Sequence, residues 1–509
     1  MKNIFVGICI FLFFVIFGYV LYSNQNKKVS EISVLNGFDV KLNPYGNNEL
    51  AAVVDFQTAQ PAQIKLIVKG RDGAEDISYT DFNAKTNHSI EILGLYPDYK
   101  NMIFLTAYYP NKIEESVLVI PVPKVKKRSL FVITQKNDTQ TRYHWLSDGI
   151  VFDEDGWMRF SFDGKGGLCY WFNRNEVIVE FRNRGIYRYS PAGKLLKHYT
   201  YPTGFTSFAH GMGQKPNGNF LVIGSFADSF VMVDGEKQKT HRDFFIEIDY
   251  HTGKVINKVD LAEVLNPNRS IIVKKGHFDY GMNDWCHING IDYDKNDNSV
   301  VVSCRHSGMV KVNEKTHELV WMITPNKGFE TSGRMGVGPD IHHKVLTAVN
   351  KKDKQYNVDV QQGKQMVPDF KWPTKNHNAR VVGKGLFALF DNSGPIFDNT
   401  VQTTDVSYAS IFKVDEKKHT VSQYWMQPLG MRSDVGSSVV YNQKDNDVIV
   451  FISQVFDKNQ DNVAHADLIR YDFNTHKELF HAVIYQGGVS WGYLSSEFDF
   501  YSKRVEEDR

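Results

Sequence analysis

Residues 286–308 read CHINGIDYDKNDNSVVVSCRHSG, and this stretch decides the fold. It contains a strand marked by polar residues, a turn near Lys295 and a valine-rich strand, which is the pattern of a β-hairpin. The same pattern occurs three more times, as AHGMGQKPNGNFLVIGS from Ala209, NHNARVVGKGLFALFDNSG from Asn376 and SDVGSSVVYNQKDNDVIVFIS from Ser433. Recurrence of one such unit indicates a repeat architecture.

A second hairpin follows each of these copies. It reads as an alternating apolar strand, an Asp or Asn, a polar turn and another alternating strand. The second hairpins begin at Phe244, Gly308, Ala409 and Asp467, and an earlier one begins at Gly185. Two hairpins give four strands, which is the unit of a β-propeller blade, and the irregular spacing of the copies requires insertions between strands.

A closed ring cannot leave its first and last blades with open edges. The segments SLFVITQ from Ser129 and WGYLSSEFDFYS from Trp491 are suitable strands for a sixth blade shared between the two ends of the ring. The sequence therefore predicts a six-bladed β-propeller over residues 125–509, with its chemistry on the axis.

Composition agrees with an all-β protein that does not bind nucleic acid. The chain has 509 residues, 42% of them hydrophobic, so it can fill large cores. Its formal net charge is +1, so it lacks the excess of basic residues that nucleic-acid binding requires. No long amphipathic helix is predicted after residue 30.

The N-terminal part differs from the repeats. Residues 1–29 are predicted to be a signal anchor or a signal peptide, because Ile4 to Tyr22 form an apolar helix about long enough to cross a bilayer. An uncleaved anchor is favoured because no small-x-small cleavage site follows. Residues 30–124 alternate like the strands of a small β-sandwich and end in the linker PVPKVKKRS from Pro121.

Cysteine is sparse for an exported protein: Cys9, Cys169, Cys286 and Cys304. Cys286 and Cys304 flank the hairpin at Lys295 and lie almost opposite each other, which permits a cross-strand disulfide. We expect instead two buried free thiols, and neither interpretation makes them catalytic.

Three histidines occupy one place in successive repeats: His210, His287 and His377. Inner strands line the channel of a propeller, so equivalent residues converge on the axis. Strand alternation puts Asn289 and Arg305 on the face of His287. A single strand histidine is more often structural, but three in one place favour a site. Four other histidines have no counterpart at the same place in another repeat and are interpreted as surface or packing residues: His306, His317, His342 and His343.

The chemistry that suits this set is transfer of an anionic group. The sequence lacks a carboxylate pair at repeat positions, a Gly-x-Ser-x-Gly motif and a Cys-x-Pro-x-Arg motif. Neutral imidazole is a nucleophile toward phosphoryl or sulfuryl centres, and cationic donors hold the oxygens. The alternatives are a non-catalytic propeller whose histidines hold a metal or an anion, and a hydrolase that passes the group to water.

The segments HGMGQKPNGNFLV, DWCHINGIDYDKNDNSVVVSCRHSGMVKV and NHNARVVGKGLFALFDN resemble the bacterial arylsulfate sulfotransferases, as does KLNPYGNNELAA near the N-terminus. The resemblance implies an N-terminal β-sandwich, a six-bladed propeller, a homodimer and a periplasmic location. It also implies transfer of a sulfuryl group from a phenolic sulfate ester to a phenolic acceptor, without a cofactor, a metal or a nucleotide sulfate donor.

The resemblance also implies roles for single residues. His377 would be the nucleophile that becomes sulfurylated in a ping-pong cycle. His287 and Arg305 would bind the sulfuryl oxygens, with His287 also acting as acid and base, and His210 and Asn289 would complete the pocket. Where the family uses a threonine in the fifth blade, this chain offers Ser437 or Ser438. Tyr356, Phe370 and Trp372 form either aromatic walls for a phenol or surface packing.

Overall fold

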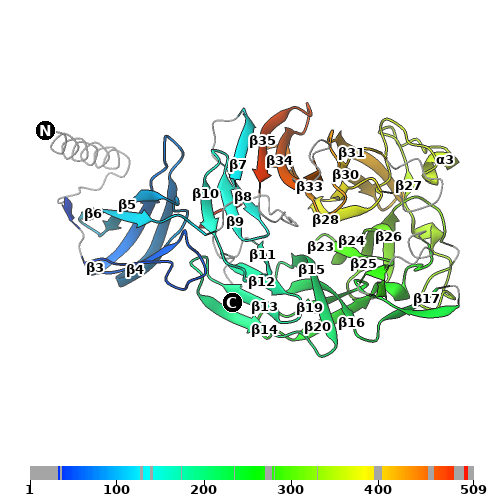
Figure 1. Ribbon diagram of the computed structural model, residues 1–509, viewed down its shortest axis with the longest axis horizontal. Coiled ribbons are helices and arrows are strands. Elements are labelled where there is room, and N and C mark those ends of the chain that lie inside the picture. Colours follow the sequence, from blue (N-terminus) through cyan, green and yellow to red (C-terminus); the bar gives the residue numbers. More distant parts are fainter. Residues whose placement is uncertain are drawn as a thin grey trace. The chain divides into compact units, whose positions relative to one another are not determined.

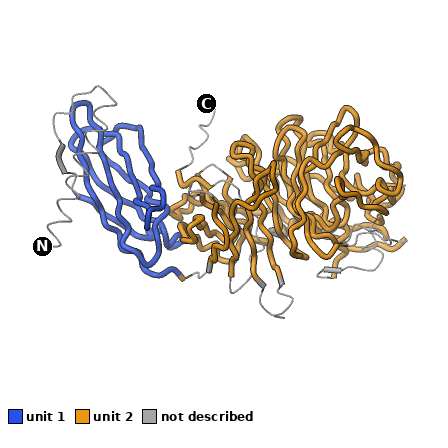
Figure 2. The backbone as a smooth tube through the Cα atoms, turned by 90° about the horizontal axis from the view of Figure 1, so that it is seen from above, with its two compact units in different colours: residues 1–125 blue, residues 126–509 orange. Residues whose placement is uncertain are grey.

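The computed structural model divides the chain into two compact units, Met1–Val125 and Lys126–Arg509 (Figure 2). It describes residues 32–34, 37–126, 130–137, 142–172, 175–233, 235–269, 278–279, 281–329, 331–394, 404–456, 464–485 and 498–501. Among these residues, no helix has the length and apolar character needed to cross a membrane. The predicted apolar helix at residues 4–22 lies outside the described part of the chain.

Unit 1 is built around one long strand that changes partners along its length. Residues 52–55 of this strand, β3, pair with β2, residues 63–68 pair with β5, and β4 follows both parts. The register shifts between Gln57 and Ala62, and such an irregularity bends the strand where its partner changes from β2 to β5. The strands are β1 (Ile32–Val34), β2 (Asp39–Leu42), β3 (Ala52–Val68), β4 (Ile77–Ile92), β5 (Tyr99–Tyr108) and β6 (Ile113–Val122).

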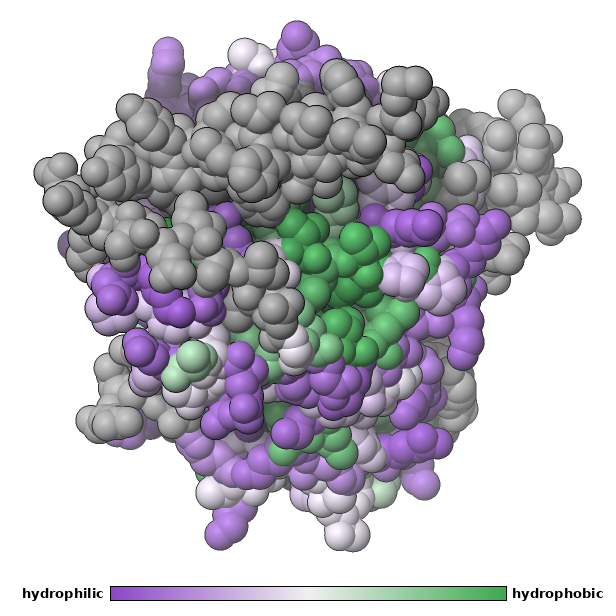
Figure 3. All heavy atoms as spheres, turned by 90° about the vertical axis from the view of Figure 1, so that its left-hand side faces the viewer, coloured by the Kyte–Doolittle hydropathy of each residue, from purple (hydrophilic) through white to green (hydrophobic). Residues whose placement is uncertain are grey.

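The two faces of the unit 1 sheet differ in exposure. Along β3 the buried residues alternate with more exposed ones, as a half-buried strand requires. The opposite face of β5 and β6 is also partly apolar, because Met102 pairs with Val119 and Phe104 with Val117. Val119 is 57% exposed. Figure 3 shows apolar side chains gathered on one face of the molecule.

Unit 2 is a β-propeller whose described residues form six blades and two separate two-stranded sheets (Figure 1). Blade 1 has β8 (Tyr143–Leu146), β9 (Ile150–Asp153) and β10 (Met158–Ser161), and blade 2 has β11 (Leu168–Trp171), β12 (Val177–Phe181), β13 (Gly185–Tyr189) and β14 (Leu195–Tyr199). Blade 3 has β15 (Phe205–Gln214), β16 (Phe220–Phe226), β19 (Phe244–Ile248) and β20 (Val255–Asp260), and blade 4 has β23 (Ile288–Asp294), β24 (Ser299–Cys304), β25 (Gly308–Asn313) and β26 (Leu319–Ile323).

The last two blades have five strands each. Blade 5 has β27 (Thr347–Ala348), β28 (Asn376–Gly383), β29 (Leu386–Asp391), β30 (Tyr408–Asp415) and β31 (Thr420–Pro428). Blade 6 has β32 (Ser438–Asn442), β33 (Asp447–Phe456), β34 (Ala464–Asp472), β35 (Glu478–Tyr485) and β7 (Leu130–Lys136). The predicted all-β class, with a propeller after a smaller β domain, is confirmed.

The ring is closed by the predicted segment near Ser129. Strand β7 pairs with β35 and so becomes the outer strand of blade 6. The second predicted closing strand begins at Trp491, and residues 486–497 lie outside the described part of the chain. Beyond them, the ring of Phe498 lies 4.7 Å from that of Trp171 and 5.7 Å from that of Trp145, so this segment packs on blades 1 and 2.

Insertions explain the irregular spacing of the repeats. The hairpin of β17 (Phe230–Val233) and β18 (Glu236–Lys239) separates β16 from β19 in blade 3. Other short elements are η1 (Leu261–Glu263), β21 (Phe278–Asp279), β22 (Met282–Asn283), η2 (His342–Lys344) and α3 (Val358–Gln361). The loop aromatics Phe370 and Trp372 are buried in a core cluster with blade 5 residues, so they do not form walls for a phenol.

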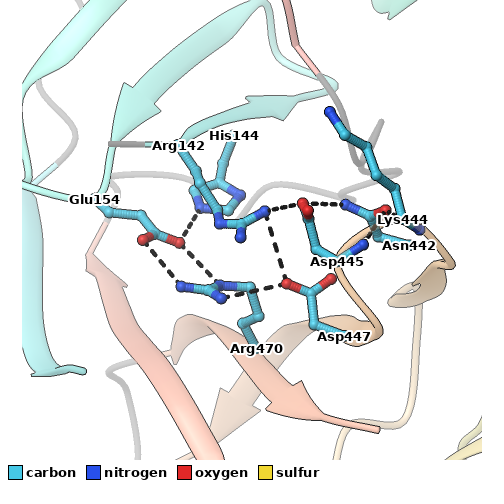
Figure 4. A network of polar contacts seen from close by, with 8 residues as sticks. All are labelled: Arg142, His144, Glu154, Asn442, Lys444, Asp445, Asp447 and Arg470. Atoms are coloured by element: carbon cyan, nitrogen blue, oxygen red, sulfur yellow. Dashed lines mark hydrogen bonds and ion pairs between the residues drawn. The ribbon is translucent and has the colours of Figure 1, made fainter. Parts of the chain in front are cut away.

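Ion pairs join successive blades at similar places. In Figure 4, Arg470 of blade 6 reaches Glu154 of blade 1 through two contacts of 3.2 Å and also contacts Asp447. Lys311 of blade 4 likewise contacts Glu416 of blade 5 at 2.8 Å. Each of these glutamates directly follows an Asp, Asp153 or Asp415. Lys215 of blade 3 contacts Glu314 of blade 4 in a similar way, and Arg188 of blade 2 donates to the main-chain carbonyl of Tyr250 in blade 3.

A buried carboxyl group in blade 2 gives the propeller a pH dependence. Glu180 is 1% exposed and accepts hydrogen bonds from Tyr170 at 3.0 Å, from Tyr201 at 3.3 Å and from Ser207. Burial raises the pKa of Glu180 to about 7, although the three hydroxyls act to lower it. The folded protein therefore binds a proton that the unfolded chain releases near pH 4.5.

We expect this proton to make the protein less stable as pH rises. The stabilisation is complete below the ordinary carboxyl pKa and is lost as pH rises through about 7. Glu180→Gln should remove this contribution, so between about pH 5 and pH 8 the variant should gain about 1–3 kcal/mol of unfolding free energy relative to wild type. Urea unfolding at both pH values measures it, and parallel pH curves for the two proteins would contradict the assignment.

Candidate active site

The predicted histidines lie where the inner strands are irregular. The ladders shift register between Ser207 and Met212 in blade 3, between Ile288 and Gly290 in blade 4, and between His377 and Arg380 in blade 5. These β-bulges turn side chains out of the regular alternation and are common next to active sites. His287 itself has a left-handed backbone, with φ of 52°. Local irregularity thus directs the imidazoles toward the axis.

Close main-chain contact brings these strands together. Strands β15, β23 and β28 lie side by side in the middle of unit 2 (Figure 1). A Cβ atom on Gly290 would lie 2.5 Å from the Cα atom of Asn378, so only glycine allows β23 to approach β28 this closely. The amide of Asn289 reinforces the contact, because it donates to the Asn376 carbonyl at 2.9 Å and accepts from Ser303 at 2.7 Å.

His210 and His287 meet at an arginine that the sequence analysis did not select. Their Nε2 atoms lie 3.2 Å apart, and Nη1 of Arg242 lies 2.9 Å from each of them. Arg242 is only 4% exposed. Since a guanidinium only donates, both Nε2 atoms accept, and each neutral ring carries its proton on Nδ1.

A carboxylate sets the tautomer of His287. Asp284 accepts from Nδ1 of His287 through one oxygen, and its other oxygen lies 3.1 Å from Nε2 of His241. Burial would raise the pKa of Asp284, but His287, His241 and Arg242 hold it well below its usual range. An ionised carboxylate behind an imidazole is the arrangement of an acid–base histidine.

His377 has a neutral partner instead. Its Nδ1 atom lies 2.5 Å from Oδ1 of Asn392, and the Asn392 amide is fixed by donating to the Ser433 carbonyl at 2.6 Å. Nδ1 therefore donates and Nε2 keeps its lone pair. The ring centre of His377 lies 6.4 Å from that of His287, so the two imidazoles face the same small region.

The remaining predicted residues surround this region. Arg305 donates to the Asp434 carbonyl of the blade 6 loop at 2.7 Å, and its backbone NH donates to the His287 carbonyl. Ser437 has φ of 80° and is buried. Its hydroxyl accepts from the Ser453 backbone and lies 3.2 Å from that of Ser433. Ser437 and Asn289 thus make hydrogen bonds within the chain, and their roles in binding substrate stay predictions.

The electrostatics keep the histidines neutral. Burial, followed by the Arg242 guanidinium, lowers the pKa of His210 to about 3. Burial also holds the pKa of His287 well below its usual range, against the influence of Asp284. For His377, burial and then Arg305 have the same effect. Neutral rings beside fixed positive charges suit an anionic substrate and a nucleophilic imidazole.

Two cysteines next to the site are joined, so the expectation of free thiols is wrong. Cys286 and Cys304 form a disulfide, with their Cα atoms 4.9 Å apart. They come directly before His287 and Arg305 in adjacent strands, and Ile288 pairs with Cys304 in the ladder. The hairpin register brings the two side chains within the reach of a disulfide. The bond links the backbones that carry two of the predicted site residues.

A metal-like grouping is also present. Asp284, His287 and His306 each place a ligand atom within 4.8 Å of the others. Because ionised Asp284 already accepts the proton of His287 Nδ1, we interpret the group as hydrogen-bonded. His306, expected at the surface or in packing, is 1% exposed with its ring 5.7 Å from that of His287.

The sequence held a signal for the missed arginine. His241 and Arg242 come just before β19, as Arg305 and His306 come just before β25. The β17–β18 hairpin separates the first pair from its repeat and hides the equivalence. A search for a basic residue that lies beside a histidine, just before the third strand of a blade, would have found Arg242.

Fold and site together define a β-propeller with a histidine–arginine centre for an anionic group on its axis. A family model described as Arylsulfotransferase (ASST) matches residues 117–493, and one described as Arylsulfotransferase Ig-like domain matches residues 39–122. The chain belongs to the arylsulfotransferase family, and the protein is a sulfotransferase enzyme. The non-catalytic alternative is therefore set aside.

Two curated relatives align over most of the chain. It is 23% identical over 541 aligned positions to arylsulfate sulfotransferase AssT of Escherichia coli O6:H1, and 22% identical over 539 positions to AssT of Lelliottia amnigena. Both alignments cover 85% of this chain and 88% of the relative. A solved structure from Bacteroides thetaiotaomicron, of unknown function, covers 90% of this chain and 99% of its own at 10% identity, but its TM-score of 0.31 carries no argument.

We expect the glycine contact at the axis to control activity. Gly290→Ala should force β23 and β28 apart and reduce sulfuryl-transfer turnover by about a hundredfold, since displacements of about 1 Å have such effects. Gly211→Ala is the matched control, because its new Cβ would lie 3.4 Å from the nearest atom, an ordinary contact. Steady-state kinetics on both variants measure this. Equal losses in the two variants would contradict the explanation.

Proposed function

We propose that the protein moves a sulfuryl group from a phenolic sulfate ester to a phenolic acceptor through a sulfurylated His377, without a nucleotide sulfate donor. The observation that carries the proposal is the contrast between two neutral imidazoles at the axis. His377 donates to an amide and keeps a free Nε2 lone pair, whereas His287 has a carboxylate behind it. Membership of the arylsulfotransferase family indicates that the transferred anionic group is a sulfuryl group.

In the first step Nε2 of His377 attacks the sulfur atom of the donor. The new N–S bond forms as the S–O bond to the aryl group breaks, and the departing phenolate takes the Nε2 proton of an imidazolium at His287, which takes up this proton from solvent when the anionic donor binds. Arg305 offers positive charge to the sulfuryl oxygens, whose negative charge is spread as in phosphoryl transfer. The neutral partner Asn392 keeps His377 a good leaving group for the next step.

In the second step the acceptor phenol loses its proton to His287 and attacks the sulfur atom. The N–S bond breaks, and His377 returns to its neutral form with the proton still on Nδ1. His287 is neutral between the steps and becomes an imidazolium again after the second step, and Asp284 stabilises that imidazolium. His210, Asn289 and Ser437 would complete the pocket. Water as acceptor gives the hydrolase alternative.

We further propose that the propeller acts outside the cytoplasm, in the periplasm, with residues 4–22 as an inner-membrane anchor. The Cys286–Cys304 disulfide supports an oxidising compartment. The family resemblance also supports a homodimer. Cell fractionation and light scattering on the full-length protein test the two points separately.

The central test uses 4-nitrophenyl sulfate with the full-length protein. We expect nitrophenolate release that depends on added phenol and falls below detection in His377→Ala. Donor without acceptor should leave one sulfuryl group on the peptide that contains His377, as seen by mass spectrometry. Release with no labelled peptide, or a label on another residue, would overturn the covalent mechanism.

The acid–base assignment predicts a dependence on the leaving group. Asp284→Asn should favour the wrong tautomer of His287 and slow transfer from phenyl sulfate by about 10²- to 10⁴-fold, since that phenolate needs a proton. Transfer from 4-nitrophenyl sulfate, whose phenolate leaves readily, should fall much less. His287→Gln should show the same selectivity. Equal losses with both donors would instead indicate a purely structural role for Asp284.

A further inference from the structure

We propose that Arg242 is a second active-site arginine, which binds an oxygen of the transferred sulfuryl group together with Arg305. The inference rests on the proposed function of this site and adds a residue to it. Arg242 comes from blade 3 and Arg305 from blade 4. The two guanidiniums would thus approach the anion from neighbouring blades.

The first support is that similar segments carry the two arginines. Arg242 stands two residues before β19 and Arg305 three residues before β25, and both strands are third in their blades. Each arginine is next to a histidine, His241 or His306, although the order of the pair is reversed. Corresponding segments of successive blades are neighbours around the axis, so a second guanidinium comes from the blade next to that of Arg305.

The second support is the identity of the partners. The buried arginines that join blades are paired with carboxylates: Arg188 holds Glu176 at 2.7 Å, and Arg470 holds Glu154 at 3.2 Å. Nη1 of Arg242 lies 2.9 Å from Nε2 of two neutral imidazoles, those of His210 and His287, and its Nε lies 3.7 Å from Asp284. A neutral acceptor is a weaker partner for a guanidinium than a charged oxygen. An entering sulfuryl oxygen would therefore replace the imidazoles.

The third support is the cost of placing Arg242 there. Its backbone is left-handed, with φ of 56°, and its charge is 4% exposed. A strained conformation and a buried cation persist where the surrounding structure imposes them, typically at functional sites. Asp284, 3.7 Å from Nε, partly offsets the charge. Releasing Nη1 would also free Nε2 of His287 to exchange a proton with the phenol.

The test measures binding of inorganic sulfate by calorimetry, which does not require turnover. Wild type should bind sulfate, and Arg242→Gln should bind it on the order of tenfold to a hundredfold more weakly, because it loses a charged hydrogen bond. Arg242→Lys should recover part of the affinity. Arg184→Gln, at an exposed arginine of blade 2, is the control and should bind like wild type.

A kinetic readout separates binding from support of the fold. Arg242 lowers the pKa of both His210 and His287, so in Arg242→Gln the acid limb of kcat/KM should move to higher pH. Sulfate binding equal in wild type and Arg242→Gln, or absent from wild type, would overturn the inference. If wild type binds sulfate through Arg242 but does not turn over phenolic sulfates, the inference stands and the proposed function fails.

Discussion

Charge pairs between neighbouring blades hold the ring together. A cation in one blade reaches the residue that follows the Asp or Asn of a hairpin in the next, as Lys311 reaches Glu416 and Arg470 reaches Glu154. Arg470 and Glu154 are both buried, so removing one of them would leave the other charged and buried, and this pair fixes blade 6 against blade 1. With the blades held, the inner strands have no freedom to separate, and the imidazoles they carry stay within a few ångströms.

Within that frame the protein gives identical side chains different chemistry through their partners. A carboxylate behind His287 favours gain and loss of a proton at Nε2. An amide behind His377 leaves the Nε2 lone pair, whose bond to sulfur can form and break easily. Burial and the guanidiniums keep both rings neutral at rest. The difference between nucleophile and acid–base group therefore lies in Asp284 and Asn392.

Turn residues and the alternation of apolar and polar side chains are local features, so they reveal the repeats. The blades and the convergence of His210, His287 and His377 could therefore be predicted from the sequence. Arg242 was missed, since the β17–β18 insertion moves it away from its repeat. The opposed positions of Cys286 and Cys304 were predicted, but the sequence does not state whether two facing thiols are oxidised, and the structure shows that they are. The role of Asn289 in binding substrate stays a prediction, and its amide also ties β23 to β28, which the sequence did not reveal.

The glycine at position 290 has a consequence for how such an enzyme changes over time. Because main chain meets main chain there, the spacing of the reacting groups is fixed by backbone atoms that substitutions elsewhere do not alter. Loops at the mouth of the channel can lengthen, shorten or change composition while the imidazoles keep their positions. Selection can therefore act on which phenols enter without having to rebuild the chemistry each time.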